Sequence, residues 1–374
     1  MKIDKLGMIS IIVPTMNRSD FLIRLLRYYE DTEFDGYIFI ADGSSPDHVE
    51  RTKRVIESLR GKFTIVYKEY PGVSPAECMK RMLDDVTTPY AAFCGDDDFL
   101  VPRGLNACIN FLNEHPDYAF AHGAGVNIAL DYKGSYGKIT DCSCYSRDEM
   151  ESESAAERLD YYLRKGHITS FSVFCSEHLK QGFQVSYALK DVIFGSELIP
   201  CCHAILLGKS KRLDCFHVVR TGHVSQVASL SGFDWIANPG FSSGYQVFQD
   251  SLAKLMAQQD NISITEAKKV IKSAFCALLN TPGFLCHRQS LSSGARLESN
   301  ISPWVQFGRS IPFAQRIWQF LHSFSGVSLP ALLRQSSPYH SDFMPVYKAL
   351  TTPSREKSDA GINMGKISNR MVKR

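Results

Sequence analysis

Four short apolar runs in the first hundred residues alternate with segments whose apolar positions recur at helical spacing. The runs cover residues 8–14, 36–41, 62–67 and 90–94, and each is nearly continuous, as expected for strands buried on both faces. The segments between them, residues 20–29, 47–59 and 74–86, are predicted to be helices. Strands that alternate with helices of about 10–15 residues indicate βαβ units. We therefore predict an α/β fold with a mainly parallel sheet.

The pattern is less regular after residue 100. Helices are predicted over residues 102–114 and 149–164, and strands from residue 118, over 168–174 and over 211–220, with a polar loop at 141–147. Residues 201–207 continue a helix-like apolar run. The segment 231–291 is predicted to be largely helical, and a further helix is expected at 314–324. The polar and basic end, residues 351–374, is expected to be disordered.

Composition narrows the class of protein. The chain has 374 residues, 44% of them apolar, and its 42 basic and 39 acidic side chains leave a net charge of +3. This near balance lacks the strongly basic footprint of a nucleic-acid-binding protein. No signal-peptide pattern opens the sequence, and no run reaches the roughly 18–20 apolar residues of a membrane span. We expect a cytoplasmic protein with no transmembrane segment.

The 11 cysteines agree with that compartment. Without a secretory signal they are interpreted as reduced thiols, several of them in the core because they lie in apolar runs, namely Cys94, Cys108, Cys175 and Cys276. The pairs Cys142/Cys144 and Cys201/Cys202 lack Cys-x-x-Cys spacing, so structural zinc is not expected.

Three consecutive carboxylates, Asp96, Asp97 and Asp98, follow the fourth predicted strand. Adjacent acids repel one another, and a hard divalent cation is a common reason for a protein to hold them together. The alternative is a solvated acidic turn. The first strand ends in Pro14-Thr15-Met16-Asn17-Arg18, and the second in Asp42-Gly43-Ser44, which alone would be an ordinary turn. Parallel strands place these three ends at one edge of the sheet, where ligands of such folds bind.

Two further residues are candidates for chemistry. Glu197 lies in an otherwise apolar segment, where partial desolvation would raise its pKa and suit it to accept a proton. A Glu paired with a nearby Arg or Lys is an equal alternative. His223 follows a predicted strand beside a glycine and is a candidate for a metal or phosphate contact, although a lone His is more often structural.

Together, the segments Ser10–Arg18, Ala41–Ser45 and Thr88–Phe99 resemble an inverting family 2 glycosyltransferase of the GT-A fold. The resemblance is clear over residues 8–115, weaker over 191–223, and ends by about residue 250. It implies a Rossmann-like, nucleotide-binding GT-A domain over residues 1–225, with its nucleotide-binding part at about 8–122 and its acceptor and base part at 123–225. A mainly helical region, 226–350, would follow.

The resemblance also implies roles for single residues. Pro14, Thr15 and Arg18 would line the nucleotide pocket, and Asp42 would contact the base. The acidic run would be the DxD-type motif. In it Asp98 would be the first metal ligand, Asp96 would touch ribose or metal, and Asp97 would lie at the nucleotide. Glu197 would be the general base, and His223 a further metal or diphosphate contact. The cofactor would be Mn²⁺ or Mg²⁺, and the donor a nucleotide sugar, most often a UDP-sugar.

The sequence departs from the family pattern in three places. At the end of the second strand, the usual paired aspartates are reduced to Ala41-Asp42. Residues 72–80 lack the usual Arg and Asn after the third strand, so Lys80 is the candidate substitute there. The Gln-x-x-Arg-Trp motif is absent, which argues against a processive polysaccharide synthase.

Several alternatives stay open. One is a nucleotidyltransferase on a related scaffold, disfavoured because the first loop has no glycine; another is a non-catalytic nucleotide- or carbohydrate-binding protein. The acceptor is a carbohydrate, a lipid-linked molecule or a protein. The last third of the chain is open to an acceptor site, a homo-oligomer interface or a peripheral membrane contact.

Overall fold

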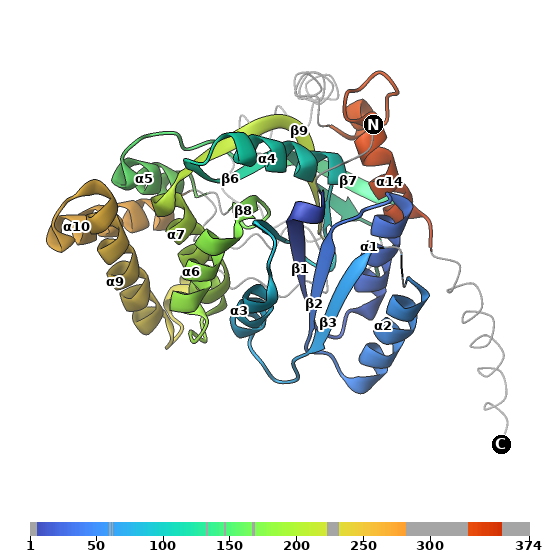
Figure 1. Ribbon diagram of the computed structural model, residues 1–374, viewed down its shortest axis with the longest axis horizontal. Coiled ribbons are helices and arrows are strands. Elements are labelled where there is room, and N and C mark those ends of the chain that lie inside the picture. The colour runs from blue at the N-terminus through green and yellow to red at the C-terminus, as the bar shows by residue number, and fades with distance from the viewer. Residues whose placement is uncertain are drawn as a thin grey trace, which may run out of the picture.

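A single nine-stranded sheet forms the centre of the molecule in the computed structural model (Figure 1). The structure describes residues 6–59, 61, 63–131, 134–145, 147–166, 169–222, 232–281 and 328–353. A short 3-10 turn, Leu6–Met8, leads into the first strand. In Figure 1, helices α1 and α2 lie at one end of the molecule, and α9 and α10 lie at the other.

The first four main strands are parallel, as the sequence predicts. Their order in the sheet is β3-β2-β1-β4. The observed bounds lie within a few residues of the prediction: β1 Ile9–Thr15, α1 Ser19–Asp31, β2 Tyr37–Asp42, α2 Pro46–Ser58, β3 Thr64–Glu69, α3 Pro75–Asp85 and β4 Tyr90–Phe93. The carboxyl ends of these strands therefore meet at one edge of the sheet.

The second half of the sheet mixes pairings. Next to β4 lies β8 (Val173–Cys175), which is antiparallel to β4 and to β6 (Tyr118–Leu130). The long strand β9 (Lys209–Gly222) is parallel to β6 and also pairs with β5 (Phe99–Leu100). The pairing of β9 with β5 brings the carboxyl end of β9 to residues 94–98, the turn that follows β4.

Three predictions in this half are wrong in their details. The predicted loop at 141–147 is largely strand β7 (Ile139–Tyr145), whose one partner among the described strands is β6. The predicted helix at 149–164 begins later, as α5 (Ala155–Lys165), because Ser154 and the distant Asp260 cap it. The predicted strand at 168–174 is observed as the short β8. The sequence analysis did not identify helix α6 (Ser176–Ser186).

Helices cover both faces of the sheet. Alternate residues of β1 divide between two apolar cores, with Ile9, Ile11 and Val13 in one and Ile12 in the other. The first core includes α1, α4 (Pro102–Glu114) and α14 (His340–Thr351). The second includes α3, α5, α6 and α7 (Ile199–Leu207), with α9 (Phe241–Asp260) and α10 (Ile264–Leu279). The predicted helical segment 231–291 is confirmed over residues 232–281, and its remaining residues lie outside the described part of the chain.

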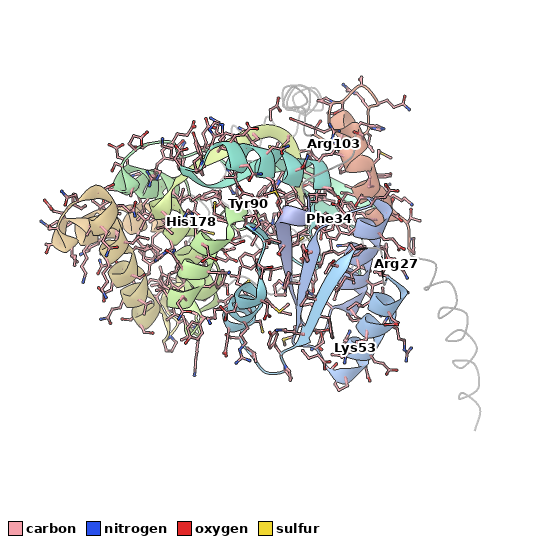
Figure 2. All side chains as sticks on the ribbon, in the orientation of Figure 1. Arg27, Phe34, Lys53, Tyr90, Arg103 and His178 are labelled. Carbon is pink, nitrogen blue, oxygen red and sulfur yellow. The ribbon has the colours of Figure 1, made fainter. Side chains whose placement is uncertain are left out.

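The C-terminal helices attach to the sheet domain at two places. Helices α9 and α10 pack against α5 and α7, whereas α14 packs against α1. Arg103 of α4 reaches towards α14, where it pairs with Asp342 at 3.2 Å (Figure 2). The short helices are α8 (Gly232–Ile236) and α13 (Leu329–Leu332). The predicted helix at 314–324 and the tail beyond residue 353 lie outside the described residues.

The cysteines follow the prediction only in part. The ten described cysteines are free thiols, and Cys94 and Cys108 are buried as predicted. Cys175 is half-buried. Cys276 is exposed on α10, so its assignment to the core is wrong; it lies among apolar residues of the sequence but on the outer side of the helix. No helix among the described residues is long and apolar enough to cross a membrane.

Candidate active site

The acidic turn after β4 is buried, although it carries three carboxylates. Asp96, Asp97 and Asp98 are 0%, 5% and 4% exposed. The turn is fixed by its backbone, because Cys94 N donates to Ile12 O at 3.0 Å and Asp98 N donates to Gly95 O at 3.1 Å. Buried carboxylates need partners that offset their lost hydration. Each of the three has a different set, so the turn is not a solvated loop.

Asp96 faces the first strand end. Thr15 donates from Oγ1 to Oδ2 of Asp96 at 2.6 Å, and Arg18 donates from Nε to the same oxygen at 3.1 Å. Arg18 also forms an ion pair with Oδ1 of Asp96, and its Nη1 lies 3.3 Å from Oδ2 of Asp97. The structure thus brings together Thr15, Arg18 and Asp96, three residues that the sequence analysis had assigned to one pocket.

Asp98 faces β9 instead. Thr221 donates its backbone N–H to Oδ1 of Asp98 at 2.8 Å, and Nε of Arg220 lies 3.9 Å from Oδ2. The Thr221 hydroxyl donates to the backbone carbonyl of Asp97 at 2.6 Å. A Cβ at Gly95 would lie 2.6 Å from Oδ1 of Asp97 and 3.1 Å from Oδ2 of Asp98. These two oxygens therefore lie beside the same stretch of backbone.

Burial changes the proton affinity of the turn. It raises the pKa of Asp96 to about 6, against the opposing charge of Arg18. It also raises the pKa of Asp98 to about 7, where the negative charge of Asp97 adds to the effect and Arg220 opposes it. Carboxyl groups whose pKa values are shifted close to neutral pH are typical of functional sites.

Two arginines complete the surroundings of the turn, and the sequence analysis identified neither. Arg24 of α1 is 1% exposed and donates from Nη2 to the backbone carbonyl of Asp97. Burial lowers its pKa to about 10. The signal for Arg24 was a charged side chain within the apolar run Phe21–Leu26. The signal for Arg220 was an arginine that ends the apolar strand segment Phe216–Val219.

Arg220 is held by aromatic rings. Its guanidinium carbon lies 4.8 Å from the ring centroid of Phe171 and 5.4 Å from that of Tyr145. Burial lowers the pKa of Arg220, but Asp98, Tyr145 and Glu197 together raise it above its ordinary value. The positive charge of Arg220 therefore acts both on the acidic turn and on Glu197.

The second strand end forms an ordered loop. Asp42 is 1% exposed and accepts from Ser44 N at 2.8 Å and from the Tyr67 hydroxyl at 2.7 Å. Asn17 bridges to this loop, because its N–H donates to Oγ of Ser44 at 2.7 Å. Gly43 N donates to Thr15 O at 2.9 Å. Half-buried Pro14 precedes these groups in β1. The first two strand ends are therefore tied together.

Lys80 lies apart from this cluster. It pairs with Asp84 on the same helix at 2.7 Å, and its ammonium group lies 5.4 Å from the ring centroid of Tyr187. Neither partner belongs to the strand ends. The structure therefore does not bring Lys80 to Asp42 or to the acidic turn. His223 lies outside the described residues.

Glu197 lies in a π-helical turn, Ile193–Leu198, that leads directly into α7. The residue is half-buried. Burial raises the pKa of its carboxyl group, and the charge of Arg220 opposes that shift. The expected desolvation is thus present. Arg220 acts on Glu197 and on Asp98, which connects the Glu197 turn electrostatically with the acidic turn.

Two carboxylates of the acidic turn are candidates to hold a hard cation. Among the residues that the structure describes, no three His, Cys, Asp or Glu side chains gather closely enough to hold a metal ion. Mg²⁺ and similar ions usually take one or two carboxylates, with phosphate and water oxygens as the other ligands. The neighbouring oxygens of Asp97 and Asp98 offer such a pair, whereas Asp96 is already engaged by Thr15 and Arg18.

Comparison with known proteins gives one family match. The model of the family described as glycosyl transferase family 2 matches residues 10–183. No curated protein matches the chain. Among solved structures, S. aureus TarS 1–349 in complex with UDP-GlcNAc is 16% identical, with 73% of each chain covered and a TM-score of 0.49. The mannosyltransferase PcManGT from Pyrobaculum calidifontis, in complex with GDP-Man and Mn²⁺, is 12% identical over 93% of this chain and 88% of that one, with a TM-score of 0.39.

Proposed function

We propose that this chain, whose residues 10–183 match the model of glycosyl transferase family 2, moves a sugar from a nucleotide-sugar donor to an acceptor hydroxyl, with inversion at the anomeric carbon. The observation that carries the proposal is the meeting, at one edge of the sheet, of the Thr15–Arg18–Asp96 cluster with Asp98 and Arg220. These groups supply both signs of charge in a buried setting, as a diphosphate and its counter-ion require.

The donor is proposed to lie across the first two strand ends. Asp42 would meet the base, and Pro14 and Thr15 would line the pocket. In the structure Arg18 forms an ion pair with Asp96. When the donor binds, Arg18 would leave Asp96 and contact a donor phosphate or the ribose. TarS is described with UDP-GlcNAc and PcManGT with GDP-Man, and we take a UDP-sugar as the first donor to test.

A divalent cation, Mn²⁺ or Mg²⁺, is proposed at the acidic turn. Asp98 is the first candidate ligand and Asp97 the nearest second one, since their oxygens lie beside the same backbone. Asp96 stays the candidate for the ribose or for the cation. When bound, the cation would neutralise the charge of the diphosphate leaving group. Arg220 would add a fixed positive charge on the same side.

Glu197 is proposed as the general base. The acceptor oxygen would attack the anomeric carbon from the face opposite the diphosphate, and its proton would pass to the Glu197 carboxylate. The bond between the anomeric carbon and the diphosphate oxygen would break, and its electron pair would leave with the diphosphate. No covalent bond between sugar and enzyme is needed. The raised pKa of Glu197 supports this role, because a base that holds its proton more tightly is a better acceptor.

A thermal-shift screen tests the proposal. UDP-GlcNAc, other UDP-sugars and GDP-Man are added with and without Mn²⁺, and a donor at 100 times its Kd should stabilise the protein by about 2.7 kcal/mol. We expect one donor to stabilise the protein only with the metal, and then to release its nucleoside diphosphate. Release of pyrophosphate from a nucleoside triphosphate would indicate a nucleotidyltransferase. Binding with no release in the presence of candidate acceptors would favour a non-catalytic protein.

A further inference from the structure

The turn that carries Glu197 is anchored at its start by Asp191. Oδ1 of Asp191 accepts from Phe194 N at 2.9 Å, and its backbone carbonyl accepts from Gly195 N at 2.8 Å. Ser186, at the end of α6, donates from Oγ to Gly195 O at 2.7 Å. π-Helical turns are rare and often mark functional sites. This one is therefore held by specific side chains.

The second carboxylate oxygen of Asp191 reaches the C-terminal helices. Oδ2 accepts from Nε1 of Trp235 at 2.7 Å, and Trp235 is fully buried in α8. One carboxylate thus joins the start of the Glu197 turn to an indole that lies about 40 residues later in the chain. A hydrogen bond to an ionised group is stronger than one between neutral groups.

Phe194 makes a second attachment within the same turn. Its ring is fully buried, and its centroid lies 4.8 Å from that of Trp235, 5.6 Å from those of Phe241 and Phe248, and 5.9 Å from that of Phe275. A Cβ at Gly244 of α9 would lie 2.5 Å from Cδ2 of Phe194, so the helix approaches the ring closely. The turn is therefore attached to the C-terminal helices both by a polar bond and by packed aromatic rings, and Trp235 takes part in each.

We propose that Asp191 and Trp235 are positioning residues that fix the turn presenting Glu197, so that helices α8–α10 determine the placement of the general base. This proposal rests on the proposed function of Glu197. A general base acts only within hydrogen-bond reach of the acceptor proton. A displacement of about 1 Å caused by a change away from the chemistry can cost about a hundredfold in rate.

Two variants and one control test the proposal. Trp235→Phe removes the indole N–H and keeps a ring in the aromatic cluster. Asp191→Asn keeps the size of the side chain, but its amide has one carbonyl oxygen to accept from the two donors, Phe194 N and Nε1 of Trp235. Phe233→Leu is the control, because Phe233 lies on the same short helix and is 71% exposed. Hydrogen exchange of residues 192–198 is measured by mass spectrometry, together with UDP release from UDP-GlcNAc in Mn²⁺.

We expect faster exchange across the turn and a kcat lower by about 10-fold to 100-fold in both variants, with KM for the donor unchanged within about twofold. The control should match the wild type in each measurement. Unchanged exchange, or faster exchange with an unchanged kcat, would overturn the positioning role. If the wild type releases no nucleoside diphosphate from UDP-GlcNAc or from any other donor of the thermal-shift screen, while exchange still rises in the variants, the proposed function fails but the anchoring role of the bond stands. Should Trp235→Phe not fold, Asp191→Asn decides.

Discussion

Arg220 of β9 lies against Asp98 of the acidic turn, with its Nε 3.9 Å from Oδ2 of the carboxylate. The guanidinium also packs over the rings of Phe171 and Tyr145. Its charge also acts on Glu197 and opposes the rise of that residue's pKa. The charge of Arg220 therefore acts on both the proposed metal site and the proposed base. Mutation of Arg220 tests both roles.

Replacing Arg220 by Gln should weaken binding of UDP in the presence of Mn²⁺ by at least about tenfold, or about 1.4 kcal/mol. The variant loses a charge beside the proposed diphosphate and leaves Asp98 with a weaker partner. Isothermal titration calorimetry measures the change in Kd. Arg212→Gln is the matched control, since Arg212 lies exposed on the same strand. Equal affinity in the two variants would remove Arg220 from the donor site.

The acidic turn predicts an unusual pH dependence of stability in the metal-free protein. In the folded state burial raises the pKa of Asp96 to about 6 and that of Asp98 to about 7, both above the ordinary value of 3.8. The folded state therefore keeps protons that the unfolded chain releases. Stability from these groups is present below about pH 4 and is lost as pH rises through 6 and 7.

We accordingly expect Tm in the presence of EDTA to fall by a few degrees between pH 5 and pH 8. Asp98→Asn should flatten this slope, because the amide does not titrate. Added Mn²⁺ should raise the Tm of the wild type more at pH 8 than at pH 5.5, since protons and the cation compete for the same oxygens. An equal Tm shift by Mn²⁺ at both pH values, or in the wild type and Asp98→Asn alike, would place the cation elsewhere.

The sequence was most informative where burial on both faces imposes continuous apolar runs. The four parallel strands and the loops that follow them were predicted within a few residues, and so was the meeting of Thr15, Arg18 and Asp96. Strand β7 was missed because it lies at an edge of the described sheet, where it pairs with β6 alone. Its side chains at Asp141, Ser143 and Cys144 are largely exposed, so no apolar pattern marks it.

Long-range contacts explain the other differences. The start of α5 depends on Asp260, a carboxylate about 105 residues away that accepts from the N–H groups of Ala155 and Ala156. Arg220 reaches the acidic turn because β9 runs parallel to β6 and pairs with β5, a registry that local sequence does not encode. Lys80 was proposed from its position along the chain, but the helix directs it to Asp84.

Tyr67→Phe should destabilise the second strand end. The Tyr67 hydroxyl donates to Oδ2 of Asp42 at 2.7 Å, and burial together with Asp42 raises the pKa of that hydroxyl. Hydrogen bonds to charged groups contribute about 1.5–3 kcal/mol, so we expect a loss in this range in urea denaturation. Tyr70→Phe is the control, because within the part of the chain that the structure describes the Tyr70 hydroxyl donates only to Sδ of Met82, at 3.6 Å. Equal losses in the two variants would argue against a strong bond at Asp42.

Glu197→Gln should reduce turnover by about 10²-fold to 10⁴-fold while the Kd for UDP with Mn²⁺ stays unchanged, because the amide keeps the shape of the side chain but cannot accept the proton. Burial raises the pKa of Glu197, so turnover of the wild type should rise with pH as the carboxyl group ionises. Arg220 opposes that rise, and Arg220→Gln should therefore move this limb of the pH–rate profile to higher pH. Glu114→Gln, an exposed position at the end of α4, serves as the control. Turnover of Glu197→Gln close to that of the wild type would assign the proton transfer to another group, and an unmoved limb in Arg220→Gln would assign the observed ionisation to a residue other than Glu197.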